Sequence, residues 1–247
     1  MRRRADGRTA GRPARIGTML AAILAVAASG RPAVAQVGHP PGDSPFRDIT
    51  IAAGPVVFAG YLFGDRGKAE AGPSNALAFG ARYELPTGRS LLVQLTAAYL
   101  RAERFIIDSR ADSASPARRT GPVDMDLLHL DVGLQLRLTG AKTWHGLAPY
   151  VGAGIGMAID VNSPGDTTNS GYHFGNKLTF GGGVGVRWYV ARQFTVHADT
   201  RLLLWRLKYP IAFRDPAPDG SRVVPLDDKL TDWTTHPWLS LGVGWTF

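Results

Sequence analysis

From residue 49 onward, the chain consists largely of segments in which apolar residues alternate with polar or small ones. In the clearest segment, residues 128–138, every second position is leucine or valine, and the positions between are His129, Asp131, Gly133, Gln135 and Arg137. A strand directs alternate residues to opposite faces, whereas a helix would spread these leucines over divergent faces. The pattern therefore predicts β-strands.

The same period-two pattern predicts eight strands. We place them near residues 49–63, 76–85, 91–104, 124–138, 147–161, 177–190, 194–207 and 232–247. Most span 10 to 16 residues, well above the five or six that are usual in a soluble sheet. A tilted strand needs about 9–11 residues to cross a bilayer, so the lengths favour transmembrane strands.

The connections between these strands alternate in length. Four are long (64–75, 105–123, 162–176 and 208–231), and three are short (86–90, 139–146 and 191–193). Long loops therefore lie on one rim of the barrel. The short turns and both chain termini lie on the other rim. This asymmetry is typical of outer-membrane barrels. The predicted fold class is all-β, an eight-stranded antiparallel transmembrane β-barrel of up-and-down meander topology.

Glycine indicates which face of each strand meets lipid. The bulky apolar side chains share one parity, and glycine shares the other with charged residues. Glycine would weaken a solvent-facing strand without benefit, whereas in a narrow lumen it makes room for the side chains opposite. We therefore expect the apolar parity to face lipid and the other to face a filled lumen. The candidates for a lumen network of ion pairs and hydrogen bonds are Arg82, Glu84, His129, Asp131, Arg137, Asp160, Arg187, His197, Asp199 and Arg201.

Aromatic residues fall near the predicted strand ends and are interpreted as two interfacial girdles. They are Tyr61, Phe63, Tyr83, Tyr99, Trp188, Phe194, Trp205, Tyr209, Trp233, Trp245 and Phe247.

The net charge of +8 among 247 residues comes largely from the first 35, which hold seven arginines and one acid. Without them the excess is +2, so no nucleic-acid partner is expected. This segment has a basic start, a 13-residue apolar run from Ile16 to Ala28, and small residues at Ala33 and Ala35. It predicts a cleaved signal peptide over 1–35, followed by a flexible lead-in over 36–48 and the barrel over 49–247.

The absence of cysteine excludes disulfides, thiol nucleophiles and Cys-ligated metals.

The closing segment carries the most specific pattern. Apolar or aromatic residues occupy alternate positions up to a terminal phenylalanine: Leu239, Leu241, Val243, Trp245 and Phe247. With the glycine-alternating strands 147–161 and 177–190, this ending resembles the small eight-stranded bacterial outer-membrane protein β-barrel family. The resemblance implies a Gram-negative-type bacterium, an outer-membrane location, and recognition of these five residues by the outer-membrane assembly machinery. It assigns no catalytic residue, because the family includes structural proteins, adhesins and a few lipid-modifying enzymes.

Little in the sequence supports a nucleotide-binding, metal-binding or catalytic site. The glycines of 181–188 lie in a strand, so they do not predict a nucleotide site. The pairs His129–Asp131 and His197–Asp199 are a weak metal signal, and buried charges must be paired in any case. We predict no catalytic residue, no metal and no cofactor.

Three functions stay open at this stage. We favour a monomer with a structural or surface-interaction role and no chemical step, in contact with outer-membrane lipids, including lipopolysaccharide phosphates at the basic loop residues. A lipid A-modifying enzyme would need a serine and a base near the outer leaflet, where His173 and His236 lie closest to Ser170 and Ser240 in sequence. A small porin-like passive pore or ligand-binding barrel would use a local cavity beside the inward glycines of strands 147–161 and 177–190. Two occupants of this cavity stay open, the side chains of Tyr150, Tyr189 and Arg201 or a small apolar ligand.

Overall fold

The computed structural model describes residues 44–49, 52–162, 165–168, 170–191 and 193–246. The predicted signal peptide, most of the lead-in and Phe247 lie outside the described residues. The chain divides into two units, Met1–Ser44 and Pro45–Phe247, and the second holds all the strands.

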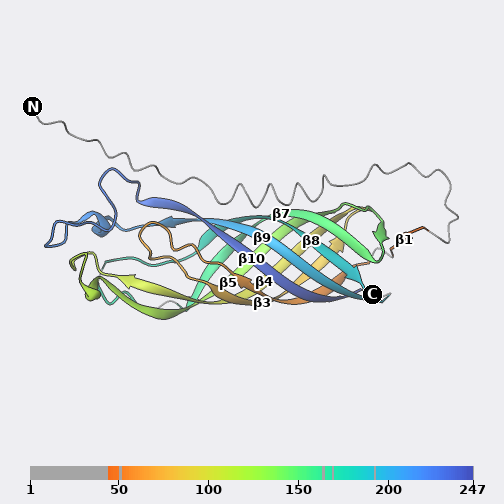
Figure 1. The fold of residues 1–247 in the computed structure, drawn as a ribbon, viewed down its shortest axis with the longest axis horizontal. Coiled ribbons are helices and arrows are strands. Elements are labelled where there is room, and N and C mark those ends of the chain that lie inside the picture. The colour runs from red at the N-terminus through yellow and green to blue at the C-terminus, as the bar shows by residue number, and fades with distance from the viewer. Residues whose placement is uncertain (1–43, 50–51, 163–164, 169, 192, 247) are drawn as a thin grey trace, which may run out of the picture. The chain divides into compact units, whose positions relative to one another are not determined.

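Eight antiparallel strands form a closed barrel, which confirms the predicted fold class (Figure 1). They are β2 (Gly54–Leu62), β3 (Ala76–Pro86), β4 (Leu91–Ile107), β5 (Arg119–Arg137), β7 (Leu147–Asn162), β8 (Lys177–Tyr189), β9 (Phe194–Lys208) and β10 (Thr231–Trp245). Each pairs with the next, and β10 pairs with β2 along Trp238–Gly244 to close the ring. Closure pairs the two edge strands of the sheet with each other, as a lipid environment requires.

The starts of two strands differ most from expectation. The first barrel strand begins at Gly54 instead of residue 49, and β5 begins at Arg119 instead of residue 124. β4 and β5 continue to pair beyond the barrel, through a register shift between Arg104 and Ile106, up to the pair Ile107–Arg119. The predicted loop 105–123 is therefore shorter, and its start and end form a projecting ribbon.

Two three-residue strands, β1 (Phe46–Asp48) and β6 (Lys142–Trp144), pair with each other beside the short turn between β5 and β7. The end of the predicted flexible lead-in is thus held against the barrel rim, and the amide of His145 also donates to the carbonyl of Pro45. Three residues are too few to show a periodic pattern, so neither strand was predictable from the sequence.

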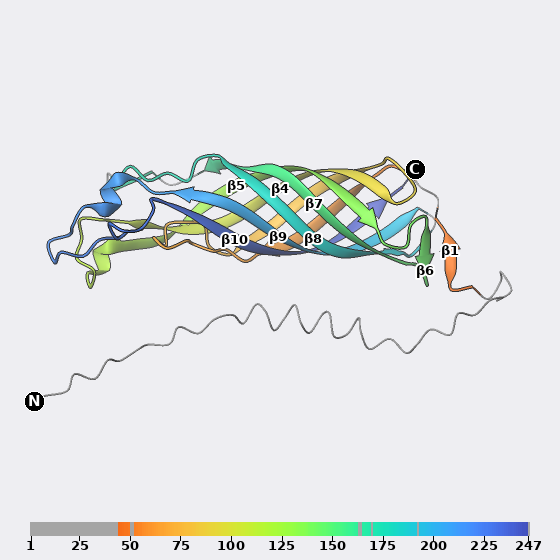
Figure 2. The same cartoon turned by 90° about the horizontal axis from the view of Figure 1, so that it is seen from above.

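The long loops gather at one end of the barrel, and the short turns lie at the other with β1 and the C-terminus (Figures 1 and 2). Two 3-10 turns, η2 (Pro116–Arg118) and η3 (Ile211–Arg214), lie in the long loops. Among the described residues, no helix has the length and apolar character to span a membrane.

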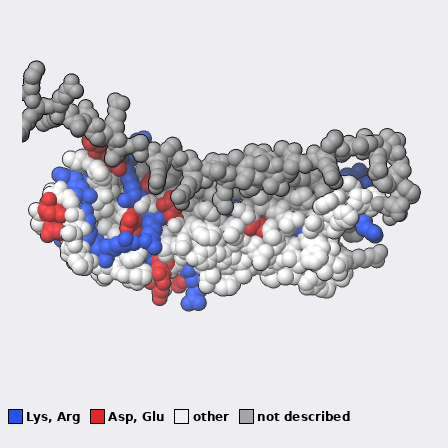
Figure 3. Space-filling view, viewed as in Figure 1, with Lys and Arg blue, Asp and Glu red and all other residues white. Residues whose placement is uncertain are grey.

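The apolar parity points outward and the polar parity inward. On β5, Val132 and Leu134 are 52% and 54% exposed, whereas Gln135 is 2% exposed. The wall of the barrel is largely uncharged on the visible face, and Lys, Arg, Asp and Glu concentrate at the loop end (Figure 3). A barrel that exposes leucine and buries arginine is suited to lipid outside and a filled lumen inside.

Two of the predicted girdle residues are placed wrongly. Trp205 and Tyr209 are buried, at 0% and 5% exposure, because they share the inward parity of Leu203 and Leu207. The outward aromatics do lie near the two ends of the strands: Tyr83, Trp188, Phe194 and Trp245 near the short turns, and Tyr61, Phe63, Tyr99 and Trp233 near the long loops.

Candidate functional site: the lumen and the loop head

One buried ion pair in the lumen joins Arg82 on β3 to Asp199 on β9. Nη1 and Nη2 of Arg82 donate to Oδ1 and Oδ2 of Asp199 at 3.2 and 2.7 Å. The hydroxyl of Tyr150 also donates to Asp199, and the guanidinium lies over the ring of Phe58 at 5.0 Å. A two-pronged Arg–carboxylate pair fixes geometry as well as charge, so this group links β2, β3, β7 and β9 across the barrel.

A second group lies around Arg187 on β8. Its Nη2 donates to Glu84 on β3 and, at 3.3 Å, to Oε1 of Gln135 on β5. The ring of His197 lies near Glu84, with Nδ1 3.9 Å from Oε1, and its Nε2 contacts the hydroxyl of Thr195 at 2.9 Å.

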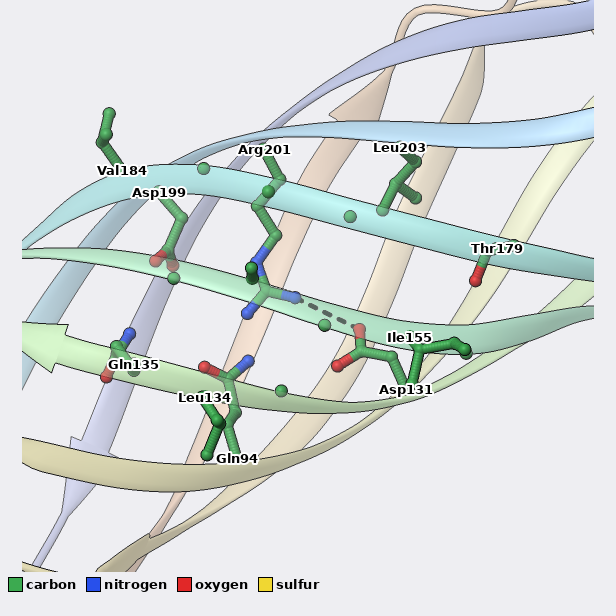
Figure 4. Close-up of a pocket in the computed structure, with 18 of the residues that line it drawn as sticks. Gln94, Asp131, Leu134, Gln135, Ile155, Thr179, Val184, Asp199, Arg201 and Leu203 are labelled. Atoms are coloured by element: carbon green, nitrogen blue, oxygen red, sulfur yellow. Dashed lines mark hydrogen bonds and ion pairs between the residues drawn. The ribbon is translucent and has the colours of Figure 1, made fainter.

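The third group consists of Asp131, Arg201 and His129. Nη1 of Arg201 on β9 donates to Oδ2 of Asp131 on β5 at 3.1 Å (Figure 4). Nδ1 of His129 lies 3.6 Å from the same oxygen, and its Nε2 contacts the hydroxyl of Thr179 at 3.2 Å. Eight of the ten predicted lumen residues therefore belong to these three groups.

Arg137 and Asp160 lie apart from them. Arg137 donates to the carbonyl of Arg89 in the 86–90 turn at 3.1 Å. Asp160, near the long loops, accepts from the amide of Gly175 at 3.3 Å. Both side chains share the inward parity, but Arg137 lies at the short-turn end of the barrel and Asp160 at the loop end.

A glycine-rich part of the wall in β5, β7 and β8 leaves a cavity beside the third group (Figure 4). Its volume is about 30 Å³, enough for two or three waters at ~10–15 Å³ each. Polar groups of Gln94, His129, Asp131, Tyr150 and Arg201 line it. A β-carbon at Gly185 would lie 2.5 Å from the Tyr150 ring, so glycine here is required by the tyrosine opposite.

Large side chains fill the lumen between the charged groups and the long loops. Trp238 packs between Phe58 and His129 at ring-centroid distances of 5.9 and 5.6 Å. Trp205 then stacks on His236 at 3.7 Å. Nδ1 of His236 accepts the amide proton of Asp65 at 3.1 Å, so this ring is neutral, with Nε2–H directed at the hydroxyl of Thr234. These aromatic and imidazole rings fill the lumen on its loop side.

No family model and no curated protein matches the chain. Among solved structures, the outer membrane protein OprG from Pseudomonas aeruginosa is similar over 83% of this chain and 99% of that one, with a TM-score of 0.50 and 12% identity. Neisserial surface protein A matches over 83% and 98%, with a TM-score of 0.45 and 14% identity. The chain has the fold of the small eight-stranded outer-membrane barrels. The likeness to OprG, at 12% identity, shows the fold alone.

The long loops of this barrel pack into what we call the loop head, the described residues of 63–75, 108–118, 165–176 and 209–230. The rings of Tyr172, Tyr209 and Phe213 stack at 5.9–6.3 Å, and Phe174 meets Trp205 at 6.0 Å. The head therefore has an apolar core continuous with the aromatic rings that fill the lumen.

Polar contacts join the tips of the loop head. Oδ2 of Asp219 accepts from the amide and hydroxyl of Ser113, each at 2.8 Å. Hydrogen bonds from Ser221 and Ser113 lower the pKa of Asp219 below its ordinary value. Lys68 bridges to Asp228 at 3.3 Å, and Arg119 to Glu70 at 2.6 Å. The loops are tied to one another rather than independent.

Asp166 is hydrogen-bonded to described residues of the loop that it belongs to. Its carboxylate accepts from the hydroxyl of Thr168 at 2.7 Å, from that of Ser170 at 3.0 Å and from the amide of Gly171 at 2.6 Å. Burial alone would raise the pKa of Asp166, but these hydrogen bonds lower it to about 2.

The residues considered for a lipid-modifying enzyme, Ser170, Ser240 and His236, are hydrogen-bonded to other groups and not to one another. Ser170 is bonded to Asp166, and the hydroxyl of Ser240 donates to Asp199 at 3.4 Å. His236 is used by Asp65 and Thr234. The hydroxyls of Ser170 and Ser240 therefore donate to carboxylates and not to histidines, and within the described part of the chain no three His, Asp or Glu side chains form a metal cluster.

Residue-pattern reasoning missed several members of the lumen groups, among them Gln135, Ser240 and Thr195. Their inward parity was a usable signal, but uncharged side chains in a strand give no hint of an ion-pair role. The partner of each charge was not predictable either, because Arg82 and Asp199 are 117 residues apart.

Proposed function

We propose that the chain is an outer-membrane protein that presents the loop head outside the cell as an interaction surface, without a chemical step. The observation that carries this is the head itself, whose loops share an apolar core and cross-loop bonds such as Ser113–Asp219. A binding surface that is already ordered loses less conformational entropy when a partner docks.

The filled lumen supports this role over a passive pore. Beside Asp131 and Arg201, the described side chains leave a cavity of about 30 Å³. The rings of Trp238 and Trp205 also fill the lumen, and each is no more than 2% exposed. Channels with free lumens occur in much larger barrels.

Orientation is the first test, and the lack of cysteine makes it direct. Ala114→Cys places a thiol on the exposed tip of one long loop. Gly88→Cys is the matched control in the short 86–90 turn, where a β-carbon meets open space. A membrane-impermeant maleimide is expected to label Ala114→Cys on intact cells and Gly88→Cys only after permeabilisation. The reverse labelling would overturn the proposal.

The two rival functions are tested in parallel. Purified barrel in planar bilayers is expected to show no steady unitary conductance, and lipid A mass spectra after overexpression are expected to match those of cells without the protein. A reproducible channel would establish the pore, and a new lipid A species that disappears with Ser170→Ala or Ser240→Ala would establish the enzyme.

A further inference from the structure

The outer wall carries two cations at a particular depth, at the loop end of β9. Arg206 and Lys208 are exposed and share the outward parity of Phe194, Leu202 and Leu204. From Phe194 to Leu204 the strand rises about 3.3 Å per residue at a tilt near 40°, which gives ~25 Å along the barrel axis. That equals the height of the apolar band of an outer-membrane barrel, so both cations lie where the lipid headgroups begin.

The aromatic residues of β10 give the same depth independently. Trp245 is in register with Phe194 at the short-turn end, and Trp233 is in register with Arg206 at the loop end. Trp233 is 56% exposed and lies 6.2 Å from the ring of Phe180 on β8. Tryptophan prefers the membrane interface, so Arg206 is held at the level of the outer aromatic girdle.

These two cations have no carboxylate partner among the described residues, unlike others at this end. Arg119 pairs with Glu70, Lys68 pairs with Asp228, and Arg101 stands opposite Asp126. By contrast, no outward position of β8, β9 or β10 in the described residues is acidic. Nη2 of Arg206 donates to the hydroxyl of Thr231 at 3.0 Å, and the charge of Lys208 repels that of Lys177 nearby.

We propose that Arg206 and Lys208 bind a phosphate group of a lipid in the leaflet next to the loop head, with Trp233 and Phe180 against the same lipid's acyl region. Side chains two positions apart on one face of a strand are ~7 Å apart, close enough for both cations to reach one phosphate. Guanidinium groups bind phosphate with geometric specificity, and a basic residue at a membrane surface strengthens the attraction to anionic lipid.

The test uses the folded barrel in micelles with bisphosphorylated lipid A as the probe, followed by native mass spectrometry. The wild type is expected to retain this lipid about ten-fold better than dephosphorylated lipid A. Arg206→Gln with Lys208→Gln is expected to remove the preference, and Arg206→Lys with Lys208→Arg is expected to restore most of it. The matched control, Arg110→Gln with Lys229→Gln, removes the same charge from exposed loop positions and is expected to keep the preference.

Two results would overturn the proposal. One is an unchanged preference in the Arg206→Gln, Lys208→Gln protein when gel mobility shows that it is folded. The other is displacement of the lipid by millimolar inorganic phosphate, which would mean that the cations bind a free anion instead of a lipid.

Discussion

Replacing Asp199 by alanine tests a lumen carboxylate that accepts hydrogen bonds from Arg82, Tyr150 and Ser240. The side chains of Arg82 and Asp199 are only 1% and 2% exposed, so removal of the carboxylate leaves a buried guanidinium without its partner. Breaking a buried ion pair in this way costs about 3–5 kcal/mol. The hydroxyl of Tyr150 also loses its acceptor, which adds about 1 kcal/mol. Against a total stability of roughly 5–15 kcal/mol, Asp199→Ala should be severely destabilised.

The assay is a urea refolding titration in detergent micelles, with the folded fraction measured by heat-dependent gel mobility. A double variant, Arg82→Met with Asp199→Leu, removes both charges and should lose less stability than Asp199→Ala, because no charge is left unpaired. Asp160→Ala is the matched control. Asp160 is also inward but half-buried, and it accepts a 3.3 Å bond from Gly175. A loss below 1 kcal/mol in Asp199→Ala, or a double variant worse than the single, would refute the reasoning.

Three further predictions concern the wall, the cavity and the loop head. Val132→Arg should cost ~2–4 kcal/mol in the same titration because it places a charge against lipid, and Gln135→Arg should cost less; the opposite order would contradict the assigned faces. Gly185→Val should destabilise the barrel by about 1–3 kcal/mol because a β-carbon there lies 2.5 Å from the Tyr150 ring, and Gly185→Val combined with Tyr150→Ala should recover part of that loss. The lowered pKa of Asp166, about 2, means that its stabilisation of the 165–171 loop is present above the unfolded value near ~3.9 and is lost as the pH falls through 2. Amide-exchange protection there should thus hold at pH 5 and fall near pH 2, and loss already at pH 5 would contradict the prediction.

The parts of the structure that the sequence predicted are those set by a long periodic signal. Period-two alternation over ten or more residues identified all eight barrel strands and the face that each turns outward. It did not identify β1 and β6, which have three residues each, nor the β4–β5 ribbon, whose second strand begins in a polar stretch. Trp205 was assigned to a girdle from its place near a strand end, although its parity already placed it in the lumen.

The candidate site was predictable as a set of residues but not as a set of contacts. Inward parity alone marked the charged lumen side chains, since a barrel strand has only two faces. Which cation meets which carboxylate depends on barrel closure and strand stagger, and these bring together residues such as Glu84 and Arg187, 103 positions apart. The loop head was beyond prediction because its order comes from contacts among four loops that share no local pattern.

Nitroxide scanning along β5 tests the central claim, that the apolar parity faces lipid around a filled lumen. The chain has no cysteine, so single cysteines at each position from 130 to 137 report without background. In reconstituted bilayers, accessibility to oxygen should peak at positions 130, 132, 134 and 136, and labels at the positions between should be shielded from both oxygen and a water-soluble nickel reagent. Oxygen maxima at the intervening positions, or strong nickel access to them, would contradict the account.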